Sequence, residues 1–193
     1  MGPVPATVAE GLDKLDQRRP GSQPVVCDTP AMKFRHELSY DAPPEKVYAM
    51  LAAPAFRRQA CAAMEVISAD VQLDPQPDGG EGFTLVIDQL QNTRDLPAFA
   101  RTFAGESTQA IQREVWLSKE SGSLSIESPG KPTSATGTIR LEPSGGGTTE
   151  VVELEIKVKV PLIGGKLEKL MAEKVAAGMD VEQTVGVTWL KEH

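Results

Sequence analysis

The sequence predicts an α+β fold in which a seven-stranded antiparallel sheet is followed by one long C-terminal helix. Two observations lead to this fold class. Apolar residues recur with period two in short runs between residues 33 and 160, which is typical of half-buried strands, and with period 3.6 over Pro161–Leu190, which is typical of an amphipathic helix. Strands gathered in one part of a chain, with the long helix after them, favour an α+β arrangement over alternating β–α units.

The first 31 residues have the composition of an N-terminal extension. The chain's 193 residues suit one domain, and glycine and proline punctuate residues 1–31. We therefore expect a flexible N-terminal extension over residues 1–31 and a folded domain over residues 32–193. The domain opens with a strand over Lys33–Tyr40, in which apolar residues and His36 alternate with charged and polar ones.

Two short helices follow this first strand. Pro44 and Glu45 fall in the first turn of one helix, where proline lacks only an unneeded N–H and a carboxylate suits the helix N-terminus. Pro54 starts the second helix, which runs to about Met64. The predicted inner face of the second helix consists of Phe56, Ala60 and Ala63.

Six further strands alternate between apolar and polar residues. The first two, Ile67–Leu73 and Phe83–Ile87, form a hairpin around a turn over residues 74–80. A fourth strand lies within Ser107–Ser118. The residues expected to face inward in the last four strands are Ile111, Val115 and Leu117; Leu124 and Ile126; Ile139 and Leu141; and Val152, Leu154, Ile156, Val158 and Val160.

The interval Asn92–Glu106 is neither a strand nor a simple turn. Asp95 is placed to cap a short helix there. The apolar side of that helix consists of Leu96, Phe99, Ala100 and Phe103. Two phenylalanines on a connector suggest a flap over something apolar, and a connector folded onto an ordinary core fits the same pattern.

The C-terminal helix has a broad apolar face that is interrupted in its middle. On a helical wheel this face comprises Ile163, Leu167, Leu170, Met171, Val175, Val181, Val185 and Trp189. Lys174, Gly178 and Glu182 lie along one line where large apolar side chains are expected, and glycine costs about 1 kcal/mol relative to alanine in a helix interior. These three residues are the predicted roof of a cavity. The rival interpretation is that Gly178 lets helix and sheet approach closely.

This order of elements resembles the START-like helix-grip superfamily, also called the polyketide cyclase/dehydrase and lipid transport superfamily, over residues 32–190. Phe34–Tyr48 is similar to the superfamily's first strand and helix start. Leu96–Phe99, Glu114–Trp116 and Val160–Glu168 are similar to segments of an uncharacterised bacterial branch that is typical of actinobacteria. The resemblance implies a helix-grip fold, with a curved sheet wrapped around the long helix and an apolar cavity for a lipid, sterol, polyketide or similar ligand. No catalytic residue carries over, because the superfamily shares no common catalytic motif.

Positions expected to face the space between sheet and helix are the candidate ligand-binding residues. They are Phe34, His36, Phe83, Leu85, Phe99, Phe103, Arg113, Met171, Lys174, Gly178 and Glu182. Their ionisable members interrupt apolar faces, and a charge in an apolar interior must find a partner, reach solvent or meet a polar group of a ligand. Ordinary alternatives stay open. His36 could bond a backbone carbonyl, Arg113 could lie outward through a register slip, and Lys174 and Glu182 could snorkel.

Charge and composition exclude several classes of function. A net charge of −7 with scattered basic residues argues against a general binder of nucleic acid or of anionic membranes. Neither a run of about 20 apolar residues nor a signal-peptide pattern occurs, so we expect a cytoplasmic protein without stable membrane insertion. Two cysteines and two histidines argue against a disulfide framework or a metal site, and we expect no cofactor. The sequence leaves the oligomeric state open.

The leading hypothesis is a protein that binds or carries a hydrophobic small molecule and is not an enzyme. One alternative is a cyclase/aromatase-like enzyme acting on a polyketide-type substrate, in which His36 and Glu182 could form an acid–base couple if they met. The other is an interaction module with a filled core. Cavity volume separates the binding hypothesis from the module with a filled core, because a ligand site needs a volume on the order of hundreds of Å3.

Overall fold

The computed structural model describes residues 30–76 and 80–193, which form seven strands and four helices. The strands are β1 (Met32–Tyr40), β2 (Ser68–Pro75), β3 (Phe83–Asn92), β4 (Ser107–Trp116), β5 (Ser121–Glu127), β6 (Thr133–Ser144) and β7 (Gly147–Val158). The helices are α1 (Pro44–Leu51), α2 (Pro54–Ala63), α3 (Ala98–Ala104) and α4 (Gly164–Glu192). The extension expected over residues 1–31 lies outside the described residues, apart from its last two.

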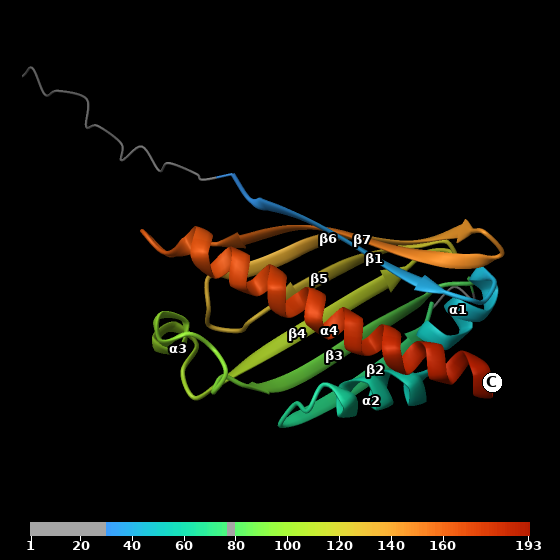
Figure 1. The fold of residues 1–193 in the computed structure, drawn as a ribbon, viewed down its shortest axis with the longest axis horizontal. Coiled ribbons are helices and arrows are strands. Elements are labelled where there is room, and N and C mark those ends of the chain that lie inside the picture. The colour runs from blue at the N-terminus through green and yellow to red at the C-terminus, as the bar shows by residue number, and fades with distance from the viewer. Residues whose placement is uncertain (1–29, 77–79) are drawn as a thin grey trace, which may run out of the picture.

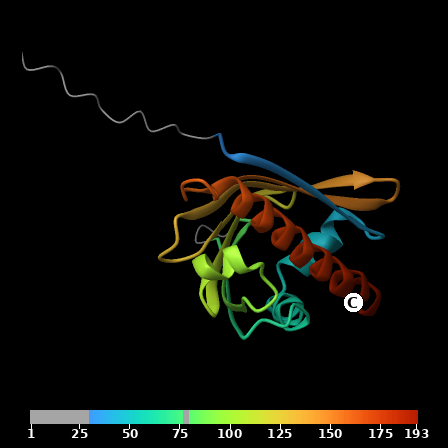
Figure 2. The ribbon, with the colours of Figure 1, turned by 60° about the vertical axis from the view of Figure 1, so that its left-hand side comes forward.

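The strands form one antiparallel sheet in the order β1-β7-β6-β5-β4-β3-β2. Because β1 and β2 are at opposite edges, α1 and α2 carry the chain from one edge to the other. α4 crosses one face of the sheet diagonally and contacts β1, β7, α1 and α2 (Figure 1). The rotated view in Figure 2 shows the other helices on the same side of the curved sheet as α4. The predicted α+β class, with its long C-terminal helix and two short helices after the first strand, is confirmed.

Large side chains fill one part of the space between sheet and helices. We call this part the closed end; it consists of Tyr40, Tyr48, Met50, Phe83 and Trp116, all buried in one apolar cluster. The ring of Tyr48 lies 5.6 Å from that of Phe83 and 5.7 Å from that of Trp116, measured between centroids. Phe83 and Trp116 are also register partners on β3 and β4, and their rings stack at 5.7 Å. Aromatic pairs at such distances stabilise a core beyond the area that they bury.

α4 is fastened to the sheet near both of its ends. In its second turn, the Glu168 carboxylate accepts a hydrogen bond of 3.0 Å from the backbone N–H of Val158, where β7 ends. Near its C-terminus Gly186 is buried, and a Cβ at this position would lie 3.0 Å from Tyr40 Cε1 and 3.1 Å from Met50 Cε. The middle of the helix is therefore held from both sides. Neither α4 nor any other helix in the described residues is long and apolar enough to span a membrane.

The inward face expected for β4 is wrong. Glu114 and Trp116 are 1% and 0% exposed, whereas Arg113 is half-exposed and Leu117, just after the strand, is 78% exposed. The physical reason is that Arg57 of α2 is buried against this face and requires a carboxylate opposite it. A satisfied ion pair and an indole ring occupy the inner positions, so the residues between them face outward.

Two element boundaries and the inner face of one helix also differ from the sequence-based expectation. Helix α3 begins at Ala98 after Pro97 without a side-chain cap, so the cap assigned to Asp95 is wrong. In α2, Ala63 is exposed and the buried residues include Arg57 and Cys61. Strand β7 stops at Val158, because the following residues enter a turn whose hydrogen bonds lead into α4.

Candidate functional site

A cavity of about 260 Å3 lies between the sheet and α4. Its wall is mostly apolar, with side chains from β5, β7, α3 and α4 among others. Representative apolar residues in the wall are Leu124, Ile126, Val152, Leu170, Met171 and Met179. The cavity lies under the middle of α4, between the two places where that helix is fastened.

Part of the cavity wall is charged although it is buried. Arg57 on α2, Glu114 on β4, Glu150 on β7 and Glu182 on α4 all line the cavity. We call these four residues the acidic cluster. Glu114 connects the cluster to the closed end, because its Oε2 accepts a hydrogen bond of 2.8 Å from Trp116 Nε1. The charged wall is thus the boundary between the filled and the open part of the interior.

Arg57 is the only guanidinium in this cluster, and all three of its nitrogens donate hydrogen bonds. Nε donates to the Leu51 carbonyl at 2.8 Å, Nη1 to Glu182 Oε1 at 2.6 Å, and Nη2 to Glu114 Oε2 at 2.8 Å. Burial by itself lowers the pKa of Arg57, but the carboxylates of Glu114 and Glu182 raise it further than burial lowers it. The guanidinium therefore stays charged in the interior.

The carboxyl groups differ in how many partners they have. Both oxygens of Glu114 accept hydrogen bonds, since Gln112 Nε2 donates to Oε1 at 2.8 Å. Glu150 is 3% exposed, and its Oε2 accepts a bond of 3.1 Å from the Tyr40 hydroxyl. Among the described residues no group bonds to Glu150 Oε1 or to the second oxygen of Glu182. Two carboxyl oxygens are consequently free to meet a ligand.

Burial changes the protonation of these carboxyl groups. It raises the pKa of Glu150 to about 8, with a further increase from Glu182 that outweighs the opposing effect of Arg57. Burial also raises the pKa of Glu182 above its ordinary value, with Arg57 opposing the shift and Glu114 adding to it. Glu150 is therefore mainly a neutral carboxylic acid at pH 7, and its proton removes one negative charge from the cavity wall.

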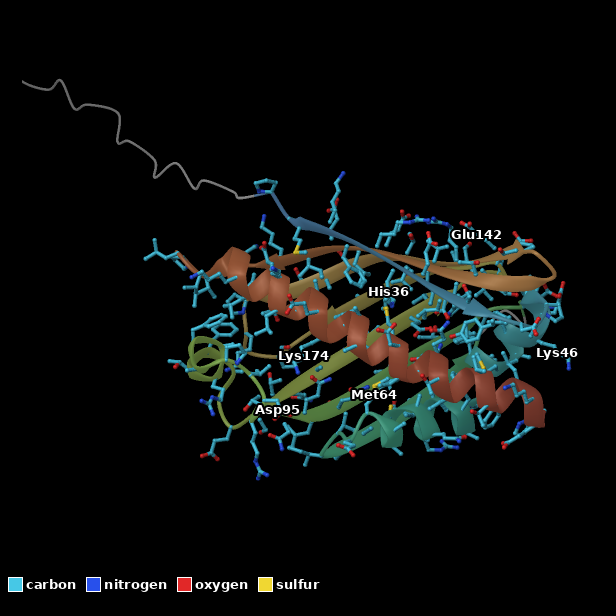
Figure 3. All side chains as sticks on the ribbon, in the orientation of Figure 1. His36, Lys46, Met64, Asp95, Glu142 and Lys174 are labelled. Carbon is cyan, nitrogen blue, oxygen red and sulfur yellow. The ribbon has the colours of Figure 1, made fainter. Side chains whose placement is uncertain are left out.

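The structure brings together some of the residues chosen from the sequence and separates others. Those that line the cavity are Phe103, Met171, Lys174, Gly178 and Glu182. Those that do not line it are Phe34, His36, Phe83, Leu85, Phe99 and Arg113. Lys174 is solvent-exposed on the N-terminal half of α4 (Figure 3). Gly178 has room beside it, since a Cβ there would meet only Met64 Sδ, at 3.9 Å.

The residues outside the cavity have identifiable surroundings. His36 on β1 places Nε2 2.8 Å from Asp180 Oδ1 on α4, and its ring stacks on Phe34 at 6.0 Å (Figure 3). The acid–base couple considered for His36 and Glu182 is thus not formed, because each has another partner. Phe83 and Leu85 are fully enclosed in the core. Phe99 is 40% exposed on α3, and Arg113 pairs with Glu127 on the outer face of the sheet.

Sequence reasoning missed Arg57, Glu114 and Glu150. Glu150 could have been found from the sequence, because it alternates in phase with Val152 and the other inward-facing residues of β7. Arg57 precedes Cys61 by four positions, so the two share one helix face. Nothing in the local pattern identifies the inner face of β4, where apolar residues occupy the outer positions. Among the described residues, no group of three or more His, Cys, Asp or Glu is arranged to hold a metal ion.

Comparisons with known proteins agree with this architecture. An uncharacterized protein of Mycobacterium tuberculosis, Rv0481c, is 26% identical in an alignment of 121 residues that covers 58% of this chain and 70% of that protein. A START superfamily protein from Mycobacterium smegmatis has a TM-score of 0.54 at 15% identity and covers 83% of this chain and 97% of its own.

A larger protein contains the same fold. The di-domain ARO/CYC StfQ from the steffimycin biosynthetic pathway has a TM-score of 0.60 at 14% identity, covering 84% of this chain and 51% of that one. At these identities the likeness establishes the fold, and the helix-grip fold expected from the sequence is confirmed. Residues 35–190 match the family described as "Protein of unknown function (DUF2505)", and the chain belongs to that family.

Proposed function

We propose that the protein binds or carries a hydrophobic small molecule in the cavity beneath α4. The observation that carries this proposal is the open volume of about 260 Å3 between the sheet and α4. Packed interiors contain few voids larger than a water molecule, whereas ligand pockets measure about 300–1,000 Å3. The volume favours a small ligand, or one part of a larger ligand, over an interaction module with a filled core.

The chemistry of the wall supports the same function. Ligand sites are mostly apolar and contain a few polar groups that orient the bound molecule. Here Met171 and Met179 offer flexible apolar surface from α4, while the acidic cluster supplies polar groups. Phe103 of α3 borders the cavity, and Lys131 donates a hydrogen bond of 2.8 Å to its carbonyl oxygen. Helix α3 is thereby held across one side of the cavity.

Uptake of apolar probes by the purified full chain tests this function. We expect native mass spectrometry after extraction and reloading to detect a bound apolar probe, and Gly178→Leu to weaken its binding by about tenfold or more by filling the cavity. Gly165→Leu is the matched control, because a Cβ at Gly165 meets nothing within 4 Å and Gly165 does not line the cavity. A wild-type protein that takes up no apolar probe contradicts the proposal. A probe recovered chemically altered would favour the cyclase-like enzyme instead.

A further inference from the structure

We propose that the ligand of this cavity is an amphipathic amine whose positively charged nitrogen lies against Glu150 and Glu182. The inference rests on the proposed ligand-binding function and adds a chemical class to it: an organic cation with an apolar body. Three features of the cavity wall lead to this class. They are the commitment of the hydrogen-bond donors around its carboxyl groups, the open carboxyl oxygens, and the three carboxyl groups set against two basic side chains.

Donors in the charged part of the wall already have protein acceptors. All three nitrogens of Arg57 are engaged, and the Tyr40 hydroxyl donates to Glu150. The side-chain amides are engaged as well. Gln112 Nε2 donates to Glu114, Gln91 Nε2 donates to Gln89 Oε1 at 3.0 Å, and Gln89 Nε2 lies 3.6 Å from Cys61 Sγ. Beside these groups an anionic ligand would have to break one of these bonds; donors of the wall that are unpartnered among the described residues, such as Lys174 Nζ and Thr133 Oγ1, lie elsewhere in the lining.

Acceptors remain open in the same wall. Glu150 is 97% buried, since its exposed fraction is 3%, and it lines the cavity with Oε1 unpartnered among the described residues. Glu182 offers its second oxygen and is 13% exposed at the side chain. Neither oxygen is among the buried unpartnered side-chain atoms of the described residues, so both meet the open cavity, where a ligand that brings donors can bond to them.

The charges also favour a cation. The wall carries three carboxyl groups against Arg57 and Lys174, so its charges balance while Glu150 keeps its proton. Loss of that proton leaves an excess of buried negative charge, which is unfavourable unless a cation offsets it. An ammonium group supplies three donors and a positive charge, and its hydrogen bonds to carboxylates are stronger than those between neutral groups. Lys174 also lines the cavity, but it lies eight residues before Glu182 and hence about 12 Å away along α4. Its charge disfavours a cation at that position and so orients the amine toward Glu182.

Binding of an amine is coupled to a proton. The titratable or charged groups around Glu150 are Tyr40 on β1, Arg57 on α2, Glu114 on β4 and Glu182 on α4. Because burial raises the pKa of Glu150 to about 8, its proton neutralises this carboxyl in the free protein, and an ammonium group replaces that proton. Affinity for an amine therefore increases up to tenfold per pH unit from about pH 6.5 to 8 and levels off above pH 8.

Three probes with the same chain test the proposal on the full-length protein: n-octylamine, n-octanol and n-octanoate. Isothermal titration at pH 7.5 is expected to show octylamine binding about tenfold or more tighter than octanol, with octanoate weakest, because like charges oppose it. Glu150→Gln and Glu182→Gln each reduce octylamine affinity by about tenfold and leave octanol affinity nearly unchanged. Glu142→Gln is the control, since Glu142 is an exposed carboxylate on β6 away from the cavity (Figure 3).

The outcomes separate this inference from the function on which it rests. Equal affinity for the three probes, tighter binding of octanoate, or an amine preference that survives both glutamine variants overturns the amine and leaves the binding function intact. If none of the probes binds, both proposals fail. Should a glutamine variant not fold, the wild-type pH profile decides: octylamine affinity that does not rise between pH 6.5 and 8 overturns the inference.

Discussion

The closed end and the cavity lie under the same helix, yet one is filled and the other is open. At the closed end a Cβ on Gly186 would press against Tyr40 and Met50 at 3.0 and 3.1 Å. Over the cavity, two turns earlier, a Cβ on Gly178 has only an ordinary contact of 3.9 Å. Gly186 thus allows close packing of α4 against the closed end, whereas Gly178 leaves space beside the cavity. The C-terminal part of α4 fastens the fold, and its middle covers an open volume of about 260 Å3.

The largest expected difference between the two regions is in the loss of stability when one phenylalanine of each is replaced by alanine. Phe83→Ala removes a ring that contacts both Tyr48 and Trp116, and we expect it to lower the free energy of unfolding by about 3–5 kcal/mol. Phe103→Ala should cost about 1 kcal/mol or less, because Phe103 already borders open space. Urea unfolding measures both losses.

Phe103→Ala, compared with Phe99→Ala, also tests whether α3 is a flap. Phe103→Ala should speed the dissociation of a bound apolar probe, while Phe99→Ala, on the exposed side of α3, should leave that rate unchanged. Equal losses of stability from Phe83→Ala and Phe103→Ala would show that the cavity is filled in solution. The contrast between the two regions would then be wrong.

The fold was predictable because its elements have strong local periods. The alternation in β7 and the apolar stripe of α4 each extend over many residues, and the prolines at positions 44 and 54 mark helix starts that the structure retains. The interruption at Lys174, Gly178 and Glu182 also identified residues that line the cavity. An interrupted apolar stripe is a local feature, so it can be read without knowing what lies opposite.

The charged wall was not predictable in the same way. Arg57 meets Glu114 and Glu182 across 57 and 125 residues of sequence, and a pairing at such separation leaves no local pattern. Alternation on β4 even points to the wrong face, because a partnered carboxylate takes an inner position that apolar residues would otherwise occupy. A charged residue can be buried only where the fold places a partner beside it, and the local sequence does not show which residues become neighbours.

The pH dependence of stability sharpens the contrast at the boundary between the two regions. The pKa of Glu150 is about 8 in the folded protein and 4.5 ordinarily, so the folded state holds a proton that the unfolded chain releases between these values. Stability should therefore fall as pH rises from 4.5 to 8, by up to about 1.4 kcal/mol per pH unit, and level off above 8.

Glutamine variants isolate this contribution in urea unfolding at several pH values. Glu150→Gln should remove most of the slope and be more stable than the wild type at pH 8, since it buries no titrating carboxyl there. The exposed Glu142→Gln should keep the wild-type slope. If the slope of stability against pH were unchanged in Glu150→Gln, the Glu150 carboxyl would already be ionised in the free protein, with its charge balanced by neighbouring groups.

Replacing Gly178 and Gly186 by alanine should give the smallest change in stability and the most direct comparison of the two regions. Replacing glycine by alanine in a helix interior stabilises it by up to about 1 kcal/mol, provided that the methyl group has room. Gly178→Ala should show this gain in urea unfolding, because its methyl group enters open space. Gly186→Ala should show none or a loss, because Met50 and the Tyr40 ring must move, and the Tyr40 hydroxyl is held by Glu150. Equal gains at both positions would mean that α4 can lift from the closed end as readily as from the cavity, and tight packing would then not explain why one region is filled and the other open.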